Sequence, residues 1–200
     1  MFYQLLRSKI KKSKSLSLKR GDFIYREGQS PENIYFIEQG LVGLFHVSES
    51  GKETFLRVFG ENNIFGHRSF FAEDNYHANA MTLGPTKLVL ISVEECQRIC
   101  QESPELLKEV TKILAQDLGD SELRLAGLQD KSAPKRVMES LVYFKLKYPD
   151  HLWTRKEMAE YSGTTLETVA RVMAQLEKDG LIKKIGRNFE ILDIQRMLQS

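Results

Sequence analysis

The sequence lacks the features of a secreted, membrane-spanning or disulfide-stabilised protein. Its 200 residues include two cysteines, Cys96 and Cys100, and no apolar run approaches the roughly 18 residues of a membrane helix. The N-terminus lacks the apolar core and cleavage site of a signal peptide, so we expect a cytoplasmic protein without membrane contacts. A nucleophile–base pair, a metal-binding cluster and a phosphate-binding loop are also missing, which argues against an enzyme.

Charge is unevenly distributed along the chain, although the net charge is only +2. Residues 1–20 hold 7 basic residues and no acidic ones, residues 21–132 carry a net charge of −8, and residues 133–200 carry +3. An acidic middle beside a basic end predicts that only part of the molecule contacts a polyanion. Four apolar residues can seat the basic N-terminal segment on the protein as a short helix: Phe2, Leu5, Leu6 and Ile10.

The segment from Gly21 to about Val93 has the pattern of short β-strands. Runs rich in Ile, Phe, Tyr and Val are separated by glycine turns, and residues 34–47 and 48–58 include two hairpins. Many short strands at this spacing predict an antiparallel sandwich or roll. Such a barrel can hold a small ligand.

Residues 104–128 are predicted to form one long helix. Apolar residues recur there at steps of three or four, with one polar interruption: Leu107, Val110, Leu114, Leu118, Ser121, Leu125 and Leu128. A seam of this length is typical of a coiled coil and predicts a partner helix. The alternative is packing against the chain's own β segment, which takes part of the stripe.

Residues 154–180 indicate two short helices joined by a tight turn. Thr154 stands three residues before Glu157, and Thr164 stands three residues before Glu167, so each pair can form a capping box. Between the two helices, Gly163 is free to take a positive φ. Upstream, Ser132 is predicted to cap a helix from Ala133 to about Tyr148. Downstream, residues 181–185 and 188–192 are strand-like and suggest a wing.

The second of these short helices has two distinct faces. Apolar residues fall on one side at helical spacing: Val169, Val172, Met173 and Leu176. Glu167 and Arg171 fall on the opposite side, where a guanidinium can bind guanine and a carboxylate can accept from cytosine. The alternative is an ordinary surface helix with an i,i+4 ion pair.

Three segments resemble the cyclic-nucleotide-binding β-roll of the CRP/FNR transcription regulators: GDFIYREG at 21–28, YFIEQG at 35–40 and Phe65-Gly66. The helix-turn-helix follows in the family's own order, so the resemblance covers nearly the whole chain. It implies an α+β fold with an N-terminal antiparallel β-roll of the jelly-roll (double-stranded β-helix) type, a long dimerisation helix and a C-terminal winged helix-turn-helix. The implied domains are 1–128 and 129–200, and the implied partners are double-stranded DNA, a second copy of the chain and RNA polymerase.

The resemblance also implies which residues contact DNA. The expected base contacts are Glu167 and Arg171. Contacts to phosphates or bases near the helix N-terminus, and wing contacts to the backbone, are expected from five further residues: Thr164, Thr165, Thr168, Lys184 and Arg187. At Leu166 the cyclic AMP regulator has an Arg, whereas FNR-like members have an apolar residue, which suggests an operator nearer the FNR half-site. The two half-sites of the palindrome should lie about 34 Å apart.

An effector pocket is implied at seven positions: Gly66, His67, Arg68, Ser69, His77, Ala78 and Ser121. Members that bind cyclic AMP use a Glu for the ribose hydroxyl and an Arg-Ser pair for the cyclic phosphate. Here His67 stands in the Glu position, His77 in the Arg position and Ala78 in the Ser position. A His that is largely neutral near pH 7 is a weak substitute for a bidentate Arg, so these residues argue against cyclic AMP.

The nature of the effector stays open. Either the roll keeps the fold and has lost its ligand, or it binds a different molecule, for which Arg68 and Ser69 are candidate anion contacts. Ser121 is a candidate ligand or dimer contact. Two histidines at this spacing form no haem or metal signature, and an N-terminal iron–sulfur cluster is not expected because no cysteine precedes Cys96. A cyclic-nucleotide regulatory subunit that acts through protein contacts is the alternative function.

Overall fold

The computed structural model describes residues 2–186 and 188–199. The chain folds into two compact units, one ending at Ser121 and the other beginning at Glu122. This division falls within one helix, α4 (Pro104–Asp130), which therefore contributes residues to both units. The domain boundary predicted between residues 128 and 129 falls within the same helix.

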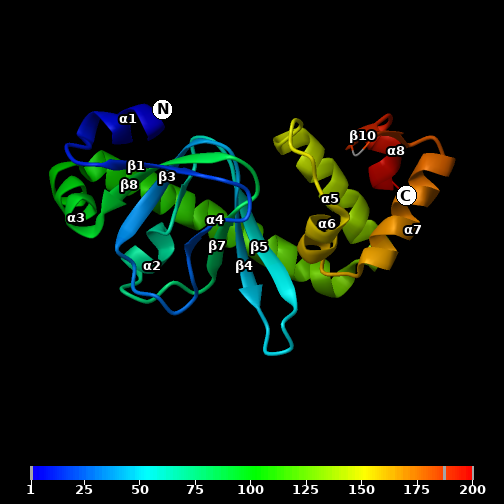
Figure 1. Cartoon of the computed structure of the whole chain (residues 1–200), viewed down its shortest axis with the longest axis horizontal. Coiled ribbons are helices and arrows are strands. Elements are labelled where there is room, and N and C mark those ends of the chain that lie inside the picture. The colour runs from blue at the N-terminus through cyan, green and yellow to red at the C-terminus, as the bar shows by residue number, and fades with distance from the viewer. Residues whose placement is uncertain (1, 187, 200) are drawn as a thin grey trace. The chain divides into compact units, whose positions relative to one another are not determined.

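The N-terminal unit is built on two four-stranded antiparallel sheets, with strand orders β1-β8-β3-β6 and β2-β7-β4-β5 (Figure 1). The strands are β1 (Lys14–Leu18), β2 (Phe23–Tyr25), β3 (Asn33–Gln39), β4 (Val42–Val47), β5 (Glu53–Phe59), β6 (Ile64–Phe65), β7 (Asn79–Thr82) and β8 (Thr86–Ser92). Three further helices belong to this unit: α1 (Phe2–Lys9), α2 (His67–Phe71) and α3 (Val93–Glu102). The predicted antiparallel roll is confirmed.

Aromatic side chains fill the interior of the roll. Tyr25 stacks on Tyr76 with ring centroids 3.6 Å apart, and Tyr35 stacks on Phe65 at 5.0 Å. Both pairs belong to one buried cluster that also contains Ala78, which is fully buried. Aromatic rings bury large apolar areas. The runs of Ile, Phe, Tyr and Val in the sequence therefore form a core between the two sheets.

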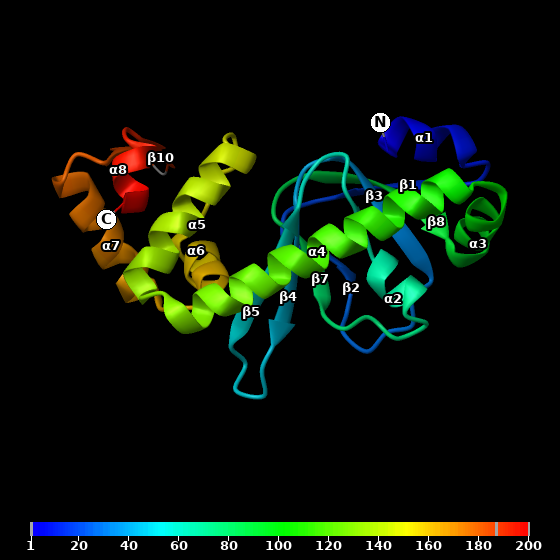
Figure 2. The same cartoon turned by 180° about the vertical axis from the view of Figure 1, so that it is seen from behind.

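A second buried cluster joins the helices of the N-terminal unit to the roll. Figure 2 shows α4 running along the roll. The cluster brings together Leu6 of α1, Phe36 of β3, Ile99 of α3 and Val110 of α4. Ile10 packs against its edge, so the structure confirms two of the four predicted N-terminal contacts. The other two, Phe2 and Leu5, have side chains outside the described part of the chain.

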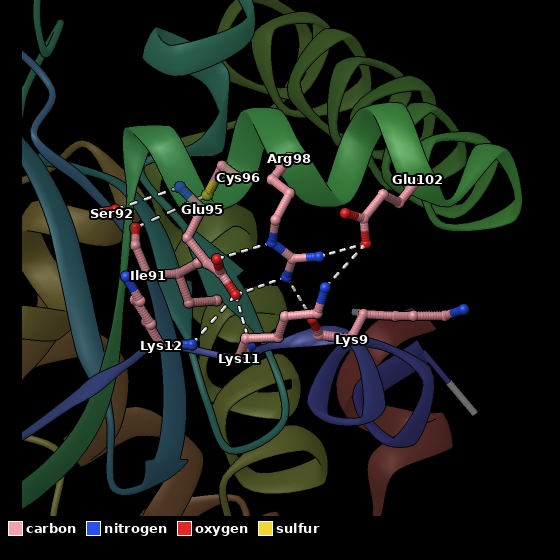
Figure 3. Close-up of polar contacts among 9 residues, drawn as sticks. All are labelled: Lys9, Lys11, Lys12, Ile91, Ser92, Glu95, Cys96, Arg98 and Glu102. Carbon is pink, nitrogen blue, oxygen red and sulfur yellow. Dashed lines mark hydrogen bonds and ion pairs between the residues drawn. The ribbon is translucent and has the colours of Figure 1, made fainter.

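A buried carboxylate fastens the basic N-terminal segment to α3 (Figure 3). The Glu95 carboxylate accepts hydrogen bonds from the backbone N–H groups of Lys11 and Lys12, at 2.6 and 3.2 Å. Arg98, one turn along α3, donates to both carboxylate oxygens and also to the carbonyl oxygen of Lys9 at 2.6 Å. Hydrogen bonds from Arg98, aided by the two backbone N–H groups and opposed by burial, lower the pKa of Glu95 to about 2.

In the C-terminal unit, helices α5, α6 and α7 pack on one another, and α5 and α7 also contact a small hairpin. Its elements after α4 are α5 (Ala133–Lys147), α6 (Arg155–Ser162), α7 (Leu166–Lys178), β9 (Ile182–Ile185), β10 (Asn188–Ile191) and α8 (Ile194–Gln199). Ser132 caps α5 by accepting from the N–H of Lys135, as predicted. Trp153 stacks on Phe144 with centroids 3.7 Å apart, and both side chains are buried. Among the described residues, none of the helices has the length and apolar character needed to span a bilayer.

Replacing Glu95 with Gln should release the N-terminal segment from α3. A neutral amide cannot accept these hydrogen bonds as strongly, so the Lys11 and Lys12 amides should lose protection from hydrogen exchange. Because the pKa of Glu95 lies below its value in an unfolded chain, the contribution to stability is complete above about pH 4.3. It should decrease as the pH falls from there towards about 2.

The matched control is Glu94→Gln, since Glu94 is exposed on the same helix. Hydrogen exchange followed by mass spectrometry at neutral pH, and unfolding measured across the acid range, provide the two readouts. Equal protection of the two amides in both variants would show that Glu95 does not hold the segment.

Candidate DNA interface and effector pocket

Helix α6 begins with the predicted capping box. The Thr154 hydroxyl accepts from the N–H of Glu157 at 3.1 Å, and the Glu157 carboxylate accepts from the N–H of Thr154 at 2.8 Å. The helix ends at Gly163, whose φ of 62° lies in the left-handed region and whose N–H bonds to the carbonyl of Ala159. Such a turn favours glycine, because glycine has no Cβ that would clash in the left-handed conformation.

The start of α7 differs from the prediction by one residue. Thr165, rather than Thr164, is the N-cap, and its hydroxyl accepts from the N–H of Thr168 at 3.3 Å. The capping box predicted for Thr164 and Glu167 is therefore wrong. The N–H of Thr164 instead bonds to the carbonyl of Ala159 in the left-handed turn, and this takes up one more residue before the helix begins.

Helix α7 buries one face and exposes the other, as predicted. Its buried side chains are Val169, Val172, Met173 and Leu176. The exposed face carries Leu166, Glu167 and Arg171. Within the part of the chain that the structure describes, no acidic side chain pairs with Arg171, so the i,i+4 ion pair with Glu167 does not form. The Arg171 side chain lies exposed on this face.

The wing is a two-stranded antiparallel hairpin in which Phe189 faces Lys184 across the pair β9–β10. Lys184 is already engaged, because its ammonium group forms an ion pair with Glu177 of α7. Gly186 turns the hairpin with a φ of 59°. Arg187, the other wing residue predicted to contact DNA, lies outside the described residues.

Two arginines that the sequence reasoning missed brace the turn between α6 and α7. Arg136 of α5 donates to the carbonyl oxygens of Ser162 at 2.9 Å and Gly163 at 3.1 Å. Arg124 donates to the carbonyl of Tyr161 at 2.7 Å and lies over its ring. Helix C-termini leave carbonyl groups without partners, and guanidinium groups satisfy them here. Both contacts are long-range in sequence, so no local pattern reveals them.

The predicted effector residues after Phe65 separate into different environments. Gly66 has a φ of 81° and precedes α2, where His67 and Ser69 are buried and Arg68 is exposed. The Ser69 hydroxyl donates to the carbonyl of Asn75 at 3.0 Å, so it serves the local fold. Arg68 is left as the exposed cation of the segment.

His77 and Ala78 lie on opposite sides of the chain just before β7. Ala78 is fully buried in the aromatic core, whereas His77 is exposed. Desolvation, and after it the positive charge of Arg68, lower the pKa of His77 below its ordinary value. A lowered pKa favours the neutral imidazole, which lacks the charge that an anionic effector would need at this position.

His67 and Ser121 are brought together by two residues that the sequence reasoning did not identify. Arg57 of β5 forms an ion pair with Asp117 of α4 and donates to the Asp117 carbonyl at 2.7 Å and to the Ser121 hydroxyl at 3.1 Å. The His67 ring is 3% exposed, and its Nε2 lies 3.7 Å from an Asp117 carboxylate oxygen. We call Arg57, His67, Asp117 and Ser121 the pocket cluster.

The pocket cluster has little resemblance to a metal centre. In the described part of the chain, no three His, Cys, Asp or Glu side chains lie close enough to hold a metal ion together. Both nitrogens of His67 are buried without a hydrogen-bond partner among the described residues. In the pocket cluster, the charge of the Asp117 carboxylate is neutralised by the Arg57 guanidinium where α4 packs on the roll.

Two family models match the chain. The cyclic nucleotide-binding domain matches residues 15–103, and the Crp-like helix-turn-helix domain matches residues 135–200. The first match covers the roll and α3, and the second covers most of α5 together with α6, α7, the hairpin and α8. Their order along the chain is the order that the sequence predicted.

Similar proteins cover different shares of the chain. An uncharacterized protein of Haemophilus influenzae is 36% identical over 106 residues, which are 53% of this chain and 82% of that protein. Transcriptional activator protein anr of Pseudomonas aeruginosa is 23% identical over 185 residues, 88% of this chain and 75% of that protein. The solved structure of FixK2 from Bradyrhizobium japonicum has the same fold, with a TM-score of 0.86, 21% identity and coverage of 94% and 96%.

Removing the hydroxyl of Thr154 should destabilise the C-terminal unit. Thr154→Ala deletes one half of a formed capping box and should reduce the free energy of unfolding by about 1 kcal/mol. Trp153 is the chain's single tryptophan and is buried in this unit, so its fluorescence during urea unfolding reports the change. Thr164→Ala is the matched control and should cost less than about 0.5 kcal/mol, because its hydroxyl caps nothing. Equal losses would contradict this assignment of the caps.

Proposed function

The chain belongs to the CRP/FNR family of DNA-binding transcription regulators, and from this premise we propose that it binds a palindromic operator as a homodimer. The observation that carries the proposal is the division of α7 into a buried apolar face and an exposed face, where Arg171 has no ion-pair partner among the described residues. A recognition helix needs such a face to enter a major groove. Its cytoplasmic partners would be DNA and RNA polymerase.

We assign the contacts to DNA by their place on α7 and the hairpin. Arg171 would bind guanine bidentately, and Glu167 would accept from a cytosine amino group. Three threonines at the start of the helix would contact phosphates or adjoining bases: Thr164, Thr165 and Thr168. Lys184 and Arg187 would contact the backbone from the wing, and Lys184 must leave Glu177 to do so.

Leu166 supports an operator of the FNR type. Its side chain is 47% exposed at the first position of α7, beside Glu167. An apolar group there can contact a thymine methyl but cannot donate to guanine. We therefore expect half-sites that differ from the cyclic AMP type at the position Leu166 faces.

The exposed leucines of α4 support a homodimer. Leu118 and Leu125 are 60% and 59% exposed, whereas Val110 of the same seam is buried on the roll. A helix with so much apolar surface left uncovered needs another surface to pack on. A second copy of α4 would cover the seam and would present two α7 helices to successive major grooves.

Selection from random-sequence DNA tests the proposed function directly. The purified protein, with no ligand added, should enrich a palindrome whose half-sites are separated by about 34 Å. Enrichment of a single half-site or of no sequence, with folded protein, would contradict it. A parallel arm with cyclic AMP tests the altered pocket and should recover the same palindrome.

With the selected operator, a base contact by Arg171 can be distinguished from a general effect of its positive charge. Arg171→Lys keeps the positive charge but loses the bidentate geometry, so binding should weaken by about 1–3 kcal/mol with the salt dependence unchanged. Preference for guanine at one position of each half-site should weaken as well. If the preference for guanine stays unchanged in this variant, Arg171 does not take part in base recognition.

Charge placed in the α4 seam should break the homodimer. Leu118→Lys should shift the protein from dimer to monomer in sedimentation or light-scattering measurements, because two like charges would meet at the interface. Leu123→Lys is the matched control: Leu123 is 75% exposed on the same helix but lies off the seam. If the Leu118→Lys variant stays dimeric to the same extent as the Leu123→Lys variant, the dimer interface does not lie on the α4 seam.

A further inference from the structure

The pocket cluster links β5, an edge strand of the roll, to α4 through the Arg57 guanidinium. Arg57 lies on β5, and Asp117 and Ser121 lie one turn apart on α4. The two elements are 60 residues apart in sequence at the ion pair. Both side chains are largely shielded, with 20% of Arg57 and 30% of Asp117 exposed. Shielded pairs are screened less by salt than exposed ones, so this link is more than a surface contact.

The chain itself uses the donors of Arg57. The guanidinium binds the carboxylate and the backbone carbonyl of Asp117, and it donates to the hydroxyl of Ser121. Ser121 in turn donates to the same Asp117 carbonyl at 2.7 Å. An anionic small molecule that came to Arg57 would first have to displace a carboxylate of the same charge.

His67 closes the remaining side of the carboxylate. It comes from α2, which follows β6, and its ring is almost fully buried 3.7 Å from an Asp117 oxygen. Asp117 thus faces basic side chains from two different elements of the roll. The family resemblance implies that the residue at His67 contacts a bound effector. In this chain the His67 side chain faces Asp117 of α4 instead.

We propose that the Asp117 carboxylate, held by Arg57, is a built-in substitute for an effector, which fixes α4 on the roll so that operator binding needs no small molecule. The inference rests on the proposed function and goes beyond it, because it names what replaces the effector. Because the carboxylate belongs to α4, its effective concentration beside Arg57 is set by the fold and does not depend on the supply of a free molecule.

The test is a double-mutant cycle with two independent readouts. Arg57→Gln, Asp117→Asn and the double variant are compared for affinity to the selected operator and for hydrogen exchange in the segment of α4 around residues 113–121. Each single variant should bind the operator about tenfold more weakly and should exchange faster in this segment. The double variant should lose no more than either single one, because both remove the same interaction.

Asp120→Asn is the matched control, since Asp120 is an exposed carboxylate on the same helix. It should leave both readouts unchanged, and circular dichroism verifies that each variant is folded. Millimolar cyclic AMP should not raise the operator affinity of the unmodified protein.

Three results would overturn the proposal: single variants that match the unmodified protein in both readouts, losses that add in the double variant, or operator binding that cyclic AMP strengthens. The exchange readout needs no DNA. If the unmodified protein selects no operator but the cycle still appears in exchange, the proposed function fails while the anchoring of α4 stands. Loss of the cycle with intact operator binding would overturn the anchoring alone.

Discussion

Helix α4 has more apolar surface than one β-roll can cover, and this constraint shapes the rest of the molecule. Over 27 residues it buries Leu106 and Val110 against the roll and leaves Leu118 and Leu125 exposed. Helices in folded proteins gain most of their stability from tertiary packing, so both apolar sides of α4 need partners. The roll supplies one of them. Under the proposal, a second copy of the chain supplies the other, and α4 becomes the element through which roll, partner and DNA-binding unit are joined.

The side of α4 that faces the roll combines apolar and ionic contacts. Near its start Val110 lies in the buried cluster with α1, α3 and β3, and two turns later Asp117 meets Arg57 of β5. Apolar burial contributes stability without setting a unique register along a helix. A shielded ion pair with defined geometry adds specificity, because shifting α4 by one turn would leave a charge without its partner. The need to set the register of α4 explains why a polar cluster lies in a largely apolar junction.

Local patterns were enough to predict the architecture. Glycine-punctuated β runs predicted the roll, helical spacing predicted the two faces of α7, and a Thr–Glu spacing predicted the cap of α6. The cap of α7 was missed by one residue because the left-handed turn at Gly163 extends through Thr164. Arg57–Asp117 and Arg136–Gly163 could not be predicted, since each joins residues far apart in sequence whose types are common on any surface.

Under the two proposals, the chain forms a dimer whose two α7 helices fit the operator before any ligand or DNA is added. Electron–electron distance spectroscopy on a spin label at Gln175→Cys, with Cys96 and Cys100 replaced by serine, measures the separation of the two helices in solution. We predict one narrow distance distribution in the free protein that neither operator DNA nor cyclic AMP changes. A broad distribution in the free protein that narrows or shifts only when DNA or cyclic AMP is added would contradict the account.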